Sequence, residues 1–413
     1  AEIVRREQAR ITVLSAMSGT TDSLVRISRA AASGDRNAIE EQLAMLTDKY
    51  TRCIEELLRE RKQQALARMN ATFGLIRDEA AAFEEYESER KIIAQGELLT
   101  SAIFTAYLQE TGLKAECLYS PDFMVKDPGE KVDTERIGRA LARVAGDDST
   151  FFVAQGFICS DSQGRIDNLG RGGSDYSAAL MGAAVEAAEV QIWTDIDGMH
   201  NNDPRFVDNT RPIRTMSFDE AAELAYFGAK ILHPATIQPC KDHGIAVLLK
   251  NTMDPEAPGT TISNRDDDTK SFHAVAAKDG ITVIRIHSAR MLMAYGFLRK
   301  VFEIFEQYRT PIDMITTSEV AVSLTVDNDS HIDEIVRDLS ALGSIEIERG
   351  NSIVCVVGRM EHGDAGLAAR VFECVRGVPI KMISYGASHR SLAILIDTEH
   401  KKRTLQCLND GLF

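Results

Sequence analysis

The sequence has little of what marks secreted, membrane-spanning or metal-clustered proteins. Its seven cysteines are scattered, and no two of them form a CxxC pair. An odd number of scattered thiols is typical of a reducing compartment and argues against a disulfide framework or a zinc site. No apolar run reaches the roughly 20 residues needed to cross a bilayer, and the N-terminus lacks a signal-peptide pattern. We therefore expect a cytoplasmic protein.

Positive charge is also scarce. Lys plus Arg number 47 against 62 Asp plus Glu, which gives a formal net charge of −15. A surface this acidic repels nucleic acid and anionic membranes at long range. A phosphorylated ligand would therefore need a local cluster of donors. The chain of 413 residues is too long for one compact core, so we expect about two to four domains.

Proline is absent before Pro121, and neither glycine nor proline occurs between Gly34 and Gly74. Apolar residues recur through this stretch at helical spacing, which predicts helices over residues 37–69 and 75–92. The simplest interpretation of the stretch is a solvated helical layer.

Short apolar runs predict buried strands at Ile11–Leu14, Phe151–Ala154 and Val190–Trp193. An alanine-rich run predicts a helix over Ser177–Ala188. Strands that alternate with helices favour a mostly parallel sheet covered on both faces. In such sheets ligands bind beyond the carboxyl ends of the strands, so chemistry is expected just after these three runs.

Beyond a polar break at residues 251–270, the sequence repeats itself. Four blocks recur in the same order, at offsets of 68 to 72 residues. Each unit reads strand, helix, strand, turn, strand, which is typical of a small ferredoxin-like fold. The matched blocks are Ile281–Ile284 with Ile353–Val356, Val301–Glu303 with Val371–Glu373, Ile312–Ile315 with Ile380–Ile383, and Leu324–Asp327 with Leu395–Asp397.

The strongest local signal is the turn Gly-Arg-Gly-Gly-Ser-Asp at residues 170–175, which opens the alanine-rich helix. Glycines let backbone N–H groups approach an anion closely, and a helix N-terminus adds partial positive charge. Arg171 adds a planar fork suited to a carboxylate or phosphate. The alternative is a turn in which Ser174 or Asp175 merely caps the helix, but capping alone does not require an arginine. The turn therefore predicts an anion site.

Four other segments are weaker signals. Asp195, Asp197 and Asp203 either hold Mg²⁺ through water or belong to Asp-Gly and Asn-Asp-Pro turns. Lys230 follows a Gly-Ala pair and is either a phosphate contact or a surface lysine near a helix end. Residues 15–20 offer hydroxyls and backbone donors after the first strand. A carboxylate at position 97, near a helix start, also has a plain interpretation as an N-terminal helix charge.

Taken in order, these segments resemble the aspartate kinase branch of the amino-acid kinase family, of the lysine-sensitive, monofunctional type. The resemblance spans essentially the whole chain. Its most specific pieces are Gly170–Tyr176, Thr194–Arg205 and Phe227–Pro234.

The resemblance implies an α/β fold. An αβα sandwich with a largely parallel central sheet would form the kinase domain, over residues 1–266. Two ferredoxin-like ACT domains would follow it. The first would span residues 280–345, and the second would combine residues 271–279 with residues 346–413.

The resemblance also implies a reaction, in which the γ-phosphoryl group of ATP is transferred to the side-chain carboxylate of L-aspartate in the presence of Mg²⁺. The product would be 4-phospho-L-aspartate, made in the first step of lysine, threonine and methionine biosynthesis. The nucleophile is a carboxylate already ionised at neutral pH, so no general base is needed. Positioning and charge neutralisation suffice.

The family's roles carry over by position. Glu97 would hold the substrate ammonium and Arg171 its α-carboxylate. No direct metal ligand is assigned. The catalytic residues would be Arg171, Asp175 and Lys230; the substrate-binding residues Ser15, Glu97, Arg171, Ser174 and Asp175; and the ATP-binding residues Thr194, Asp195, His200, Arg205 and Lys230.

The sequence departs from the family at two places. The family begins with a strand ending in Lys-Phe-Gly-Gly-Thr-Ser, whose lysine contacts the transferred phosphoryl group, and this segment is absent here. Either the sequence is truncated or this form is inactive, and the intact downstream segments favour truncation. The family also carries tyrosine where this chain has His200. Two alternative functions remain open, a different amino-acid kinase and a non-catalytic amino-acid sensor.

The C-terminal part resembles the effector-binding half of a lysine-inhibited aspartate kinase. That resemblance implies an amino-acid effector, lysine, held between ACT domains that pair two or more identical subunits. Asp313 would bind the effector ammonium, while Ser318 and backbone groups near Phe297 would hold its carboxylate. Asp313 could instead be a plain turn carboxylate. No homoserine dehydrogenase part follows Phe413, so we expect a single activity.

Overall fold

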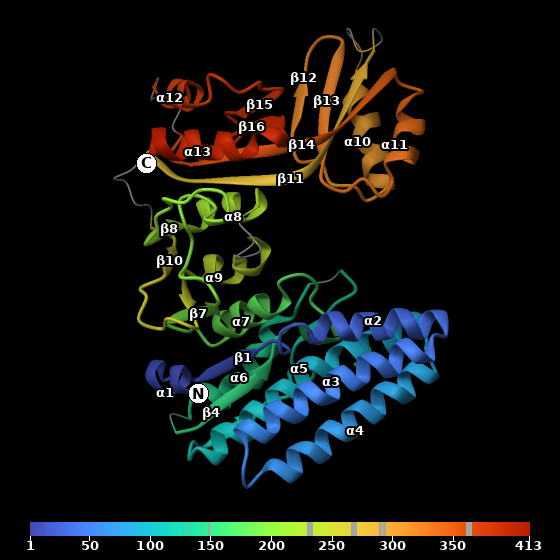
Figure 1. Ribbon diagram of the computed structural model, residues 1–413, viewed down its shortest axis with the longest axis vertical. Coiled ribbons are helices and arrows are strands. Elements are labelled where there is room, and N and C mark those ends of the chain that lie inside the picture. The colour runs from blue at the N-terminus through green and yellow to red at the C-terminus, as the bar shows by residue number, and fades with distance from the viewer. Residues whose placement is uncertain are drawn as a thin grey trace. The chain divides into compact units, whose positions relative to one another are not determined.

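A computed structural model describes the chain except for residues 130, 148, 229–233, 266–270, 289–290, 292–294 and 361–365. The described chain forms two compact units (Figure 1). The first combines Ala1–Ile192 with Ala235–Leu248, and the second combines Trp193–Pro234 with Leu249–Phe413. The domain boundaries expected from the sequence stay a prediction.

The first unit is built on a parallel sheet with the strand order β1-β4-β2. Its strands are β1 (Ile11–Leu14), β4 (Phe151–Gln155) and β2 (Ala115–Cys117). Leu14 lies opposite Gln155, so β1 and β4 end side by side. The predicted strands at these places are confirmed. Their carboxyl ends share one edge of the sheet, where a ligand is expected.

A second small sheet has the order β3-β5-β6. It comprises β3 (Val125–Lys126), β5 (Ile158–Asp161) and β6 (Ile166–Asn168), with β6 antiparallel to β5. Strand β6 ends two residues before Gly170, so the chain passes from this sheet directly into the glycine-rich turn.

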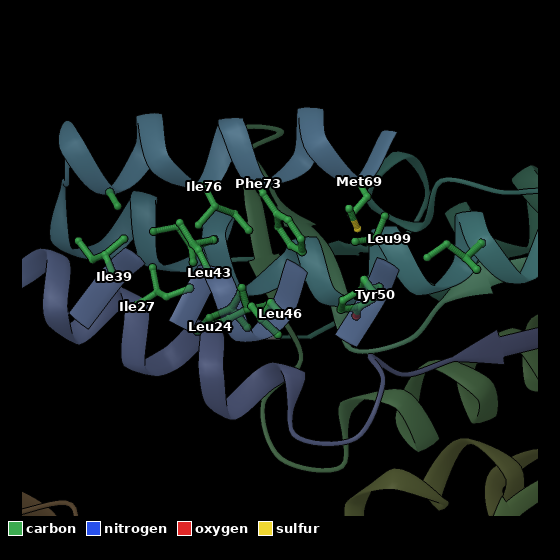
Figure 2. Packing of buried hydrophobic residues seen from close by; sticks show 14 of the residues in the cluster. Leu24, Ile27, Ile39, Leu43, Leu46, Tyr50, Met69, Phe73, Ile76 and Leu99 are labelled. Atoms are coloured by element: carbon green, nitrogen blue, oxygen red, sulfur yellow. The ribbon is translucent and has the colours of Figure 1, made fainter. Parts of the chain in front are cut away.

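The N-terminal helices form a layer with its own apolar core (Figure 2). Tyr50, Ile76 and Ile27 are fully buried in it. The helices of the first unit up to residue 110 are α1 (Glu2–Glu7), α2 (Thr20–Ser33), α3 (Arg36–Leu57), α4 (Lys62–Ala81) and α5 (Glu85–Glu110).

The predicted helix over residues 37–69 is wrong in one respect, since helix α3 ends at Leu57 and a second helix, α4, begins at Lys62. Leu58 has extended backbone angles, φ −111° and ψ 143°, and its side chain is fully buried. An apolar residue at a helix break keeps the helical spacing intact, so the pattern hid the turn. The segment predicted over residues 75–92 likewise spans the end of α4 and the start of α5.

The remaining helices of the first unit are α6 (Thr134–Ala145), α7 (Gly173–Ala184) and α9 (Gln238–His243). Helix α7 starts four residues before the predicted Ser177 and ends before Ala188. Gly172, at φ 69°, provides a left-handed N-cap that only glycine adopts easily. This early start places Ser174 and Asp175 in the first helical turn.

In the second unit, α8 (Phe218–Tyr226) opens with a capping box between Ser217 and Glu220. It follows β8 (Thr215–Ser217), which is parallel to β10 (Thr260–Ser263). The sheet order is β7-β9-β10-β8. Strands β7 (Glu189–Thr194) and β9 (Ala246–Asn251) begin in the first unit and end in the second.

The internal repeat corresponds to one antiparallel sheet of the second unit, in the order β12-β13-β11-β14-β16-β15. The long strands β11 (Phe272–His287) and β14 (Ser344–Gly358) pair along their whole length, so each serves both repeats. The other elements are β12 (Ile315–Thr317), β13 (Ala321–Val326), β15 (Met382–Tyr385), β16 (Ser391–Asp397), α10 (Phe297–Gln307), α11 (Ile332–Leu339), α12 (Leu367–Cys374) and α13 (Lys401–Leu412).

Every helix within the described ranges is too short or too polar to span a membrane.

Candidate active site

The loop after β1 lies against helix α5. A Cβ atom added to Gly96 would come within 2.8 Å of the Ala16 Cβ, so the two segments touch because position 96 lacks a side chain. The backbone N–H of Ala16 donates to Oε1 of Glu97 at 3.2 Å, and that of Met17 donates to Oγ1 of Thr100 at 3.2 Å. Glu97 is therefore held beside the Ser15 loop by α5.

Glu97 is a buried carboxyl group with one oxygen left over. The residue is 3% exposed, and burial raises its pKa from 4.5 to about 7, against the opposing effect of the hydrogen bond from Ala16. Its Oε2 has no hydrogen-bond partner among the described residues. A buried carboxylate oxygen without a partner is costly, and a bound cationic group would remove that cost. The sequence predicted the residue as a helix-end charge or a ligand, but Glu97 lies in the interior of α5.

The glycine-rich turn exposes a guanidinium group at the N-terminus of α7. Gly170 and Gly172 both have left-handed backbones, with φ of 72° and 69°. Arg171 between them is exposed and forms no ion pair with any residue that the structure describes. In a chain with more acidic than basic residues, a guanidinium without a carboxylate at a helix start is suited to bind an anion.

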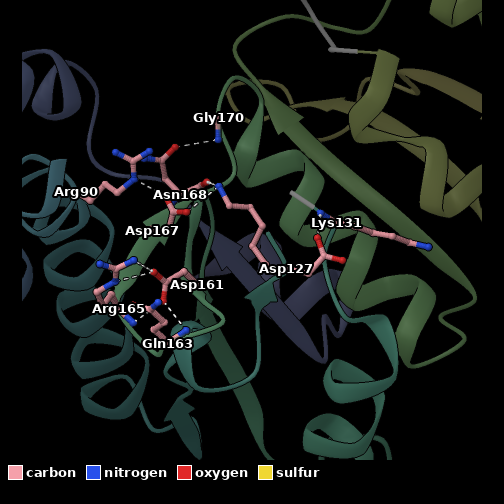
Figure 3. A network of polar contacts seen from close by, with 10 residues as sticks. Arg90, Asp127, Lys131, Asp161, Gln163, Arg165, Asp167, Asn168 and Gly170 are labelled. Carbon is pink, nitrogen blue, oxygen red and sulfur yellow. Dashed lines mark hydrogen bonds and ion pairs between the residues drawn. The ribbon is translucent and has the colours of Figure 1, made fainter. Parts of the chain in front are cut away.

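A buried ion-pair network fixes the strand that leads into this turn (Figure 3). Asp167, 4% exposed, accepts a hydrogen bond from Arg90 Nε, and its Oδ2 lies 2.8 Å from Lys126 Nζ. Burial alone would raise its pKa, but Lys126 and Arg90 hold that pKa below its usual range. The next residue, Asn168, accepts a hydrogen bond from the Gly170 N–H at 3.1 Å. The turn is thus anchored from β6.

The sequence did not single out Gly156 and Phe157, which lie between β4 and β5 and pack against the start of α7. The Gly156 N–H donates to the Leu14 carbonyl at 2.9 Å, and a Cβ at Gly156 would lie 2.6 Å from the Ser174 Cβ. Phe157 has a φ of 65°, a strained value for a large side chain and one that clusters at functional sites. The glycine after a buried strand was the signal that could have found them.

Ser15 and Ser174 are therefore brought to one edge of the sheet, with Glu97 beside them. Asp175 follows in the first turn of α7, and burial raises its pKa to about 6. The side chains of Ser15, Ser174 and Asp175 have no hydrogen-bond partner within the part of the chain that the structure covers. This edge offers a buried acid and hydroxyl groups, and the adjoining turn carries the guanidinium of Arg171. These are the kinds of group that a small zwitterion needs.

In the second unit, two of the side chains expected to bind ATP, those of His200 and Arg205, pair with neighbouring aspartates. His200 Nε2 lies 2.7 Å from Asp197 Oδ1, and its Nδ1 lies 3.0 Å from Thr210 Oγ1. Arg205 donates to both oxygens of Asp203 at 2.6 to 3.1 Å. Burial would raise the pKa of Asp203, but Arg205 holds it below its usual range.

The two interpretations of the three aspartates can now be compared. No group of three or more His, Cys, Asp or Glu side chains that could hold a metal occurs among the residues described. With two of the three carboxylates paired, the turn interpretation is favoured for Asp197 and Asp203. Asp195 is exposed and has no described ion-pair partner. Thr194 Oγ1 bonds to the backbone of Ile196, and Lys230 lies outside the described residues.

The residues expected to bind an effector lie on the antiparallel sheet and its helix. Phe297 begins α10 after Gly296, whose φ is 78°, and the Ser318 N–H donates to the Ala321 carbonyl at 2.8 Å. Asp313 is not a plain turn carboxylate, because its side chain is 2% exposed and accepts from Lys278 at 2.7 Å and from Tyr226 at 2.9 Å. Its Oδ2 has no partner within the described ranges.

The family model described as amino acid kinase matches residues 1–251. The chain belongs to the amino acid kinase family. An ACT domain model matches residues 354–412 of this amino acid kinase. The expected fold class and enzyme class are confirmed.

Proteins similar to this chain include aspartokinases, one branch of this family. This amino acid kinase is 33% identical to lysine-sensitive aspartokinase 3 of Escherichia coli, over 98% of this chain and 92% of that protein. It is 32% identical to the chloroplastic aspartokinase 1 of Arabidopsis thaliana, over 98% of this chain and 75% of that protein.

Solved structures agree. The crystal structure of E. coli aspartokinase III in complex with aspartate and ADP, in the R-state, has a TM-score of 0.87 and 32% identity, and covers 100% of this chain and 95% of its own. The T-state structure of that enzyme in complex with lysine and aspartate has a TM-score of 0.81 and 32% identity, and covers 98% and 93%.

Proposed function

We propose that this protein is an aspartate kinase that transfers the γ-phosphoryl group of ATP to the side-chain carboxylate of L-aspartate. The observation that carries the proposal is the unpartnered, buried Oε2 of Glu97, at the sheet edge against which the start of α7 packs through Gly156 and Ser174. The glycine-rich turn that carries Arg171 leads directly into this helix start. The relationship to aspartokinase III of E. coli supports it, since that enzyme has been crystallised with aspartate and ADP.

Glu97 and Arg171 would bind the two charged groups on the α-carbon of the amino acid. Glu97 would accept hydrogen bonds from the α-ammonium group, which gives its free oxygen a partner. Arg171 would hold the α-carboxylate with two parallel hydrogen bonds. With both ends fixed, and with Ser15 and Ser174 beside them, the side-chain carboxylate is left to react. Holding it near the nucleotide replaces an unfavourable bimolecular encounter.

The chemistry is a displacement at phosphorus. One oxygen of the substrate's side-chain carboxylate forms a bond to the γ-phosphorus, the bond to the β,γ-bridging oxygen breaks, and ADP leaves with that electron pair. The products are 4-phospho-L-aspartate and ADP. No proton has to be removed from the nucleophile, because it is ionised at neutral pH. The backbone N–H groups at the start of α7 would stabilise charge on the transferred group.

The nucleotide would be held by the loop that follows β7. Asp195 is exposed and has no described ion-pair partner. Of the three aspartates it is therefore the one we propose to accept a hydrogen bond from a water molecule bound to Mg²⁺. Mg²⁺ bound to ATP would neutralise phosphate charge. Thr194, His200 and Arg205 would complete the site, with Arg205 exchanging Asp203 for a phosphate. We assign Lys230 to the phosphates by resemblance alone.

Regulation would act through Asp313. The effector we propose is lysine, whose complex with the E. coli enzyme is known. An effector ammonium at Asp313 would have to replace the ammonium group of Lys278, which lies 2.7 Å from Asp313. Displacement would also disturb Tyr226, the last residue of α8 and a hydrogen-bond donor to the same carboxylate.

The assembly and location follow from weaker observations. The edge strands β12 and β15 carry the exposed apolar side chains of Ile315 and Ile383, and unpaired edges of this kind invite pairing with another subunit. We propose at least a homodimer through these domains. Seven free thiols fit a reducing compartment, and we propose the cytoplasm.

A substrate panel tests the function. The full-length protein, with any upstream coding sequence restored, is incubated with ATP, Mg²⁺ and either L-aspartate or N-acetylglutamate. Acyl phosphate is trapped as a hydroxamate while ADP release is followed. We expect both signals with aspartate and neither with N-acetylglutamate. The reverse pattern would identify another amino-acid kinase, and no hydroxamate with any acid would identify a non-catalytic sensor.

A further inference from the structure

The second unit contains a pocket that the reaction does not use. Its volume is about 420 Å³, within the range of roughly 300 to 1,000 Å³ typical of small-molecule sites. It lies among the segment before β8, the start of β11, helix α12 and the end of α13. None of the residues placed above in the aspartate, nucleotide or effector sites lines it.

The pocket is lined by three guanidinium groups, those of Arg211, Arg214 and Arg370. No side chain among the described residues that line it is acidic, although the chain carries 62 Asp plus Glu. Arg211 donates to the main-chain oxygen of Phe413 at 3.3 Å. Arg214 and Arg370 have no ion pair with any residue of the described ranges. Guanidinium groups that line one pocket repel one another, and an anion bound between them would offset that repulsion.

The rest of the wall is suited to the body of a small molecule. Arg370 lies over the ring of Phe272, with its Cζ 4.8 Å from the ring centroid, which fixes the direction of that guanidinium. Ile213 and Leu412 add apolar surface. His273 is buried in the lining, with Nδ1 2.7 Å from Glu220 Oε1 and no described partner for Nε2.

From this lining we infer a second ligand site, for a small molecule with an oxyanion head group, phosphate or carboxylate. Arginine forks match the geometry of both groups. The competing interpretation is three solvated side chains that happen to surround a hollow. The two interpretations differ in whether an anion binds at a defined affinity that depends on particular arginines.

Binding of inorganic pyrophosphate and of citrate, each measured by titration calorimetry on the full-length protein at low ionic strength, tests the inference. We expect at least one probe to bind. Arg214→Gln and Arg370→Gln should each weaken that binding about tenfold or more, as expected for a charge-assisted hydrogen bond. The preferred probe identifies the head group.

Arg376→Gln is the matched control, because Arg376 lies just after α12 and is exposed, but already pairs with Glu373 at 2.5 Å. Its affinity for the probe should be unchanged. Binding that survives both pocket substitutions would belong to the nucleotide site and overturn the inference, as would no binding of either probe. Aspartate kinase activity should persist in Arg370→Gln, so a failure here is distinct from a failure of the proposed function.

Discussion

The most informative single residue is Glu97, because in the proposed site its proton would compete with the substrate ammonium. Burial raises the pKa of the empty site to about 7, so at pH 6 the group is mostly neutral and cannot pair with an ammonium. At pH 8 it is mostly ionised. We expect the KM for aspartate to fall about tenfold between pH 6 and pH 8, while the KM for ATP changes little. A flat aspartate profile would contradict the assignment.

The same carboxyl group links pH to stability in the absence of substrate. Its folded-state pKa is raised above the usual 4.5, so its contribution to stability is present below pH 4.5 and is lost as the pH rises through about 7. The loss is roughly 3 kcal/mol at most. Glu97→Gln is the control. It should abolish aspartate use, yet make the free energy of unfolding less dependent on pH across this window.

Arg171 should act on one substrate only. Arg171→Ala removes the fork that we assign to the α-carboxylate, which charge-assisted hydrogen bonds predict to cost about 2 kcal/mol, or some thirtyfold in kcat/KM for aspartate. The KM for ATP should hardly change. Arg165→Ala is the comparison, because Arg165 lies in a nearby turn and pairs with Asp161 at 2.8 Å. Equal effects of the two substitutions would remove Arg171 from the substrate site.

Among whole elements, the close approach of the β4 loop to helix α7 is what builds the site. Gly156→Ala would place a Cβ within 2.6 to 2.8 Å of Ser174, including its Cα, so the helix start must shift. Overpacking of this kind costs about 1 to 3 kcal/mol. Because it displaces the start of α7, where we propose that the substrate binds, kcat/KM for aspartate should fall even at temperatures at which the variant remains folded. Gly74→Ala in α4 meets nothing within 4 Å and should stabilise the protein by about 1 kcal/mol.

The elements show what the sequence could and could not predict. The strands at Ile11 and Phe151 were found because short, mostly apolar runs rich in β-branched and aromatic residues are typical of a covered parallel sheet. The break at Leu58 was missed because a buried leucine continues the helical pattern. The start of α7 was missed because glycines in a helix lower its predicted propensity, although here they form its cap.

The candidate site was predictable in its residue types but not in its environment. The sequence pointed to Glu97 and Arg171, and their roles stay predictions. It could not show that Gly96 lets α5 pack closely against Ala16, so that Glu97 is buried, since that contact is between residues 80 positions apart. The pairing of Asp203 with Arg205 was equally invisible, because spacing does not reveal whether a carboxylate is free.

At the scale of the whole molecule, the second compact unit contains both the loop after β7, proposed to bind nucleotide, and the antiparallel sheet. Helix α8 ends at Tyr226, whose hydroxyl donates to Asp313, and Lys278 lies 4.6 Å from the centre of the Tyr226 ring. In the sequence, Lys230 follows Tyr226 by four residues. Asp313 is therefore hydrogen-bonded to the last residue of the helix that precedes Lys230 in the sequence, which is why we expect an effector at Asp313 to influence turnover.

Lys278 occupies the position that an effector ammonium would take, bridging Asp313 at 2.7 Å and Asp327 at 2.8 Å. Lys278→Met removes this internal competitor and leaves the buried carboxylate of Asp313 with the Tyr226 hydroxyl but without a cationic partner, which an effector ammonium can then supply. We expect inhibition at an effector concentration about tenfold lower than for the unmodified protein. Asp313→Ala should abolish inhibition and leave turnover nearly intact.

Both variants are measured by titrating kinase activity with lysine and with threonine separately, beside Lys300→Met, which changes an exposed lysine of α10. The control should keep the original inhibition curve. If Lys278→Met instead loses inhibition, Lys278 contacts the effector rather than competing with it. If Asp313→Ala stays sensitive, the effector binds elsewhere. The direction of the Lys278→Met shift is therefore decisive, because displacement requires that removing the displaced group always favours the ligand.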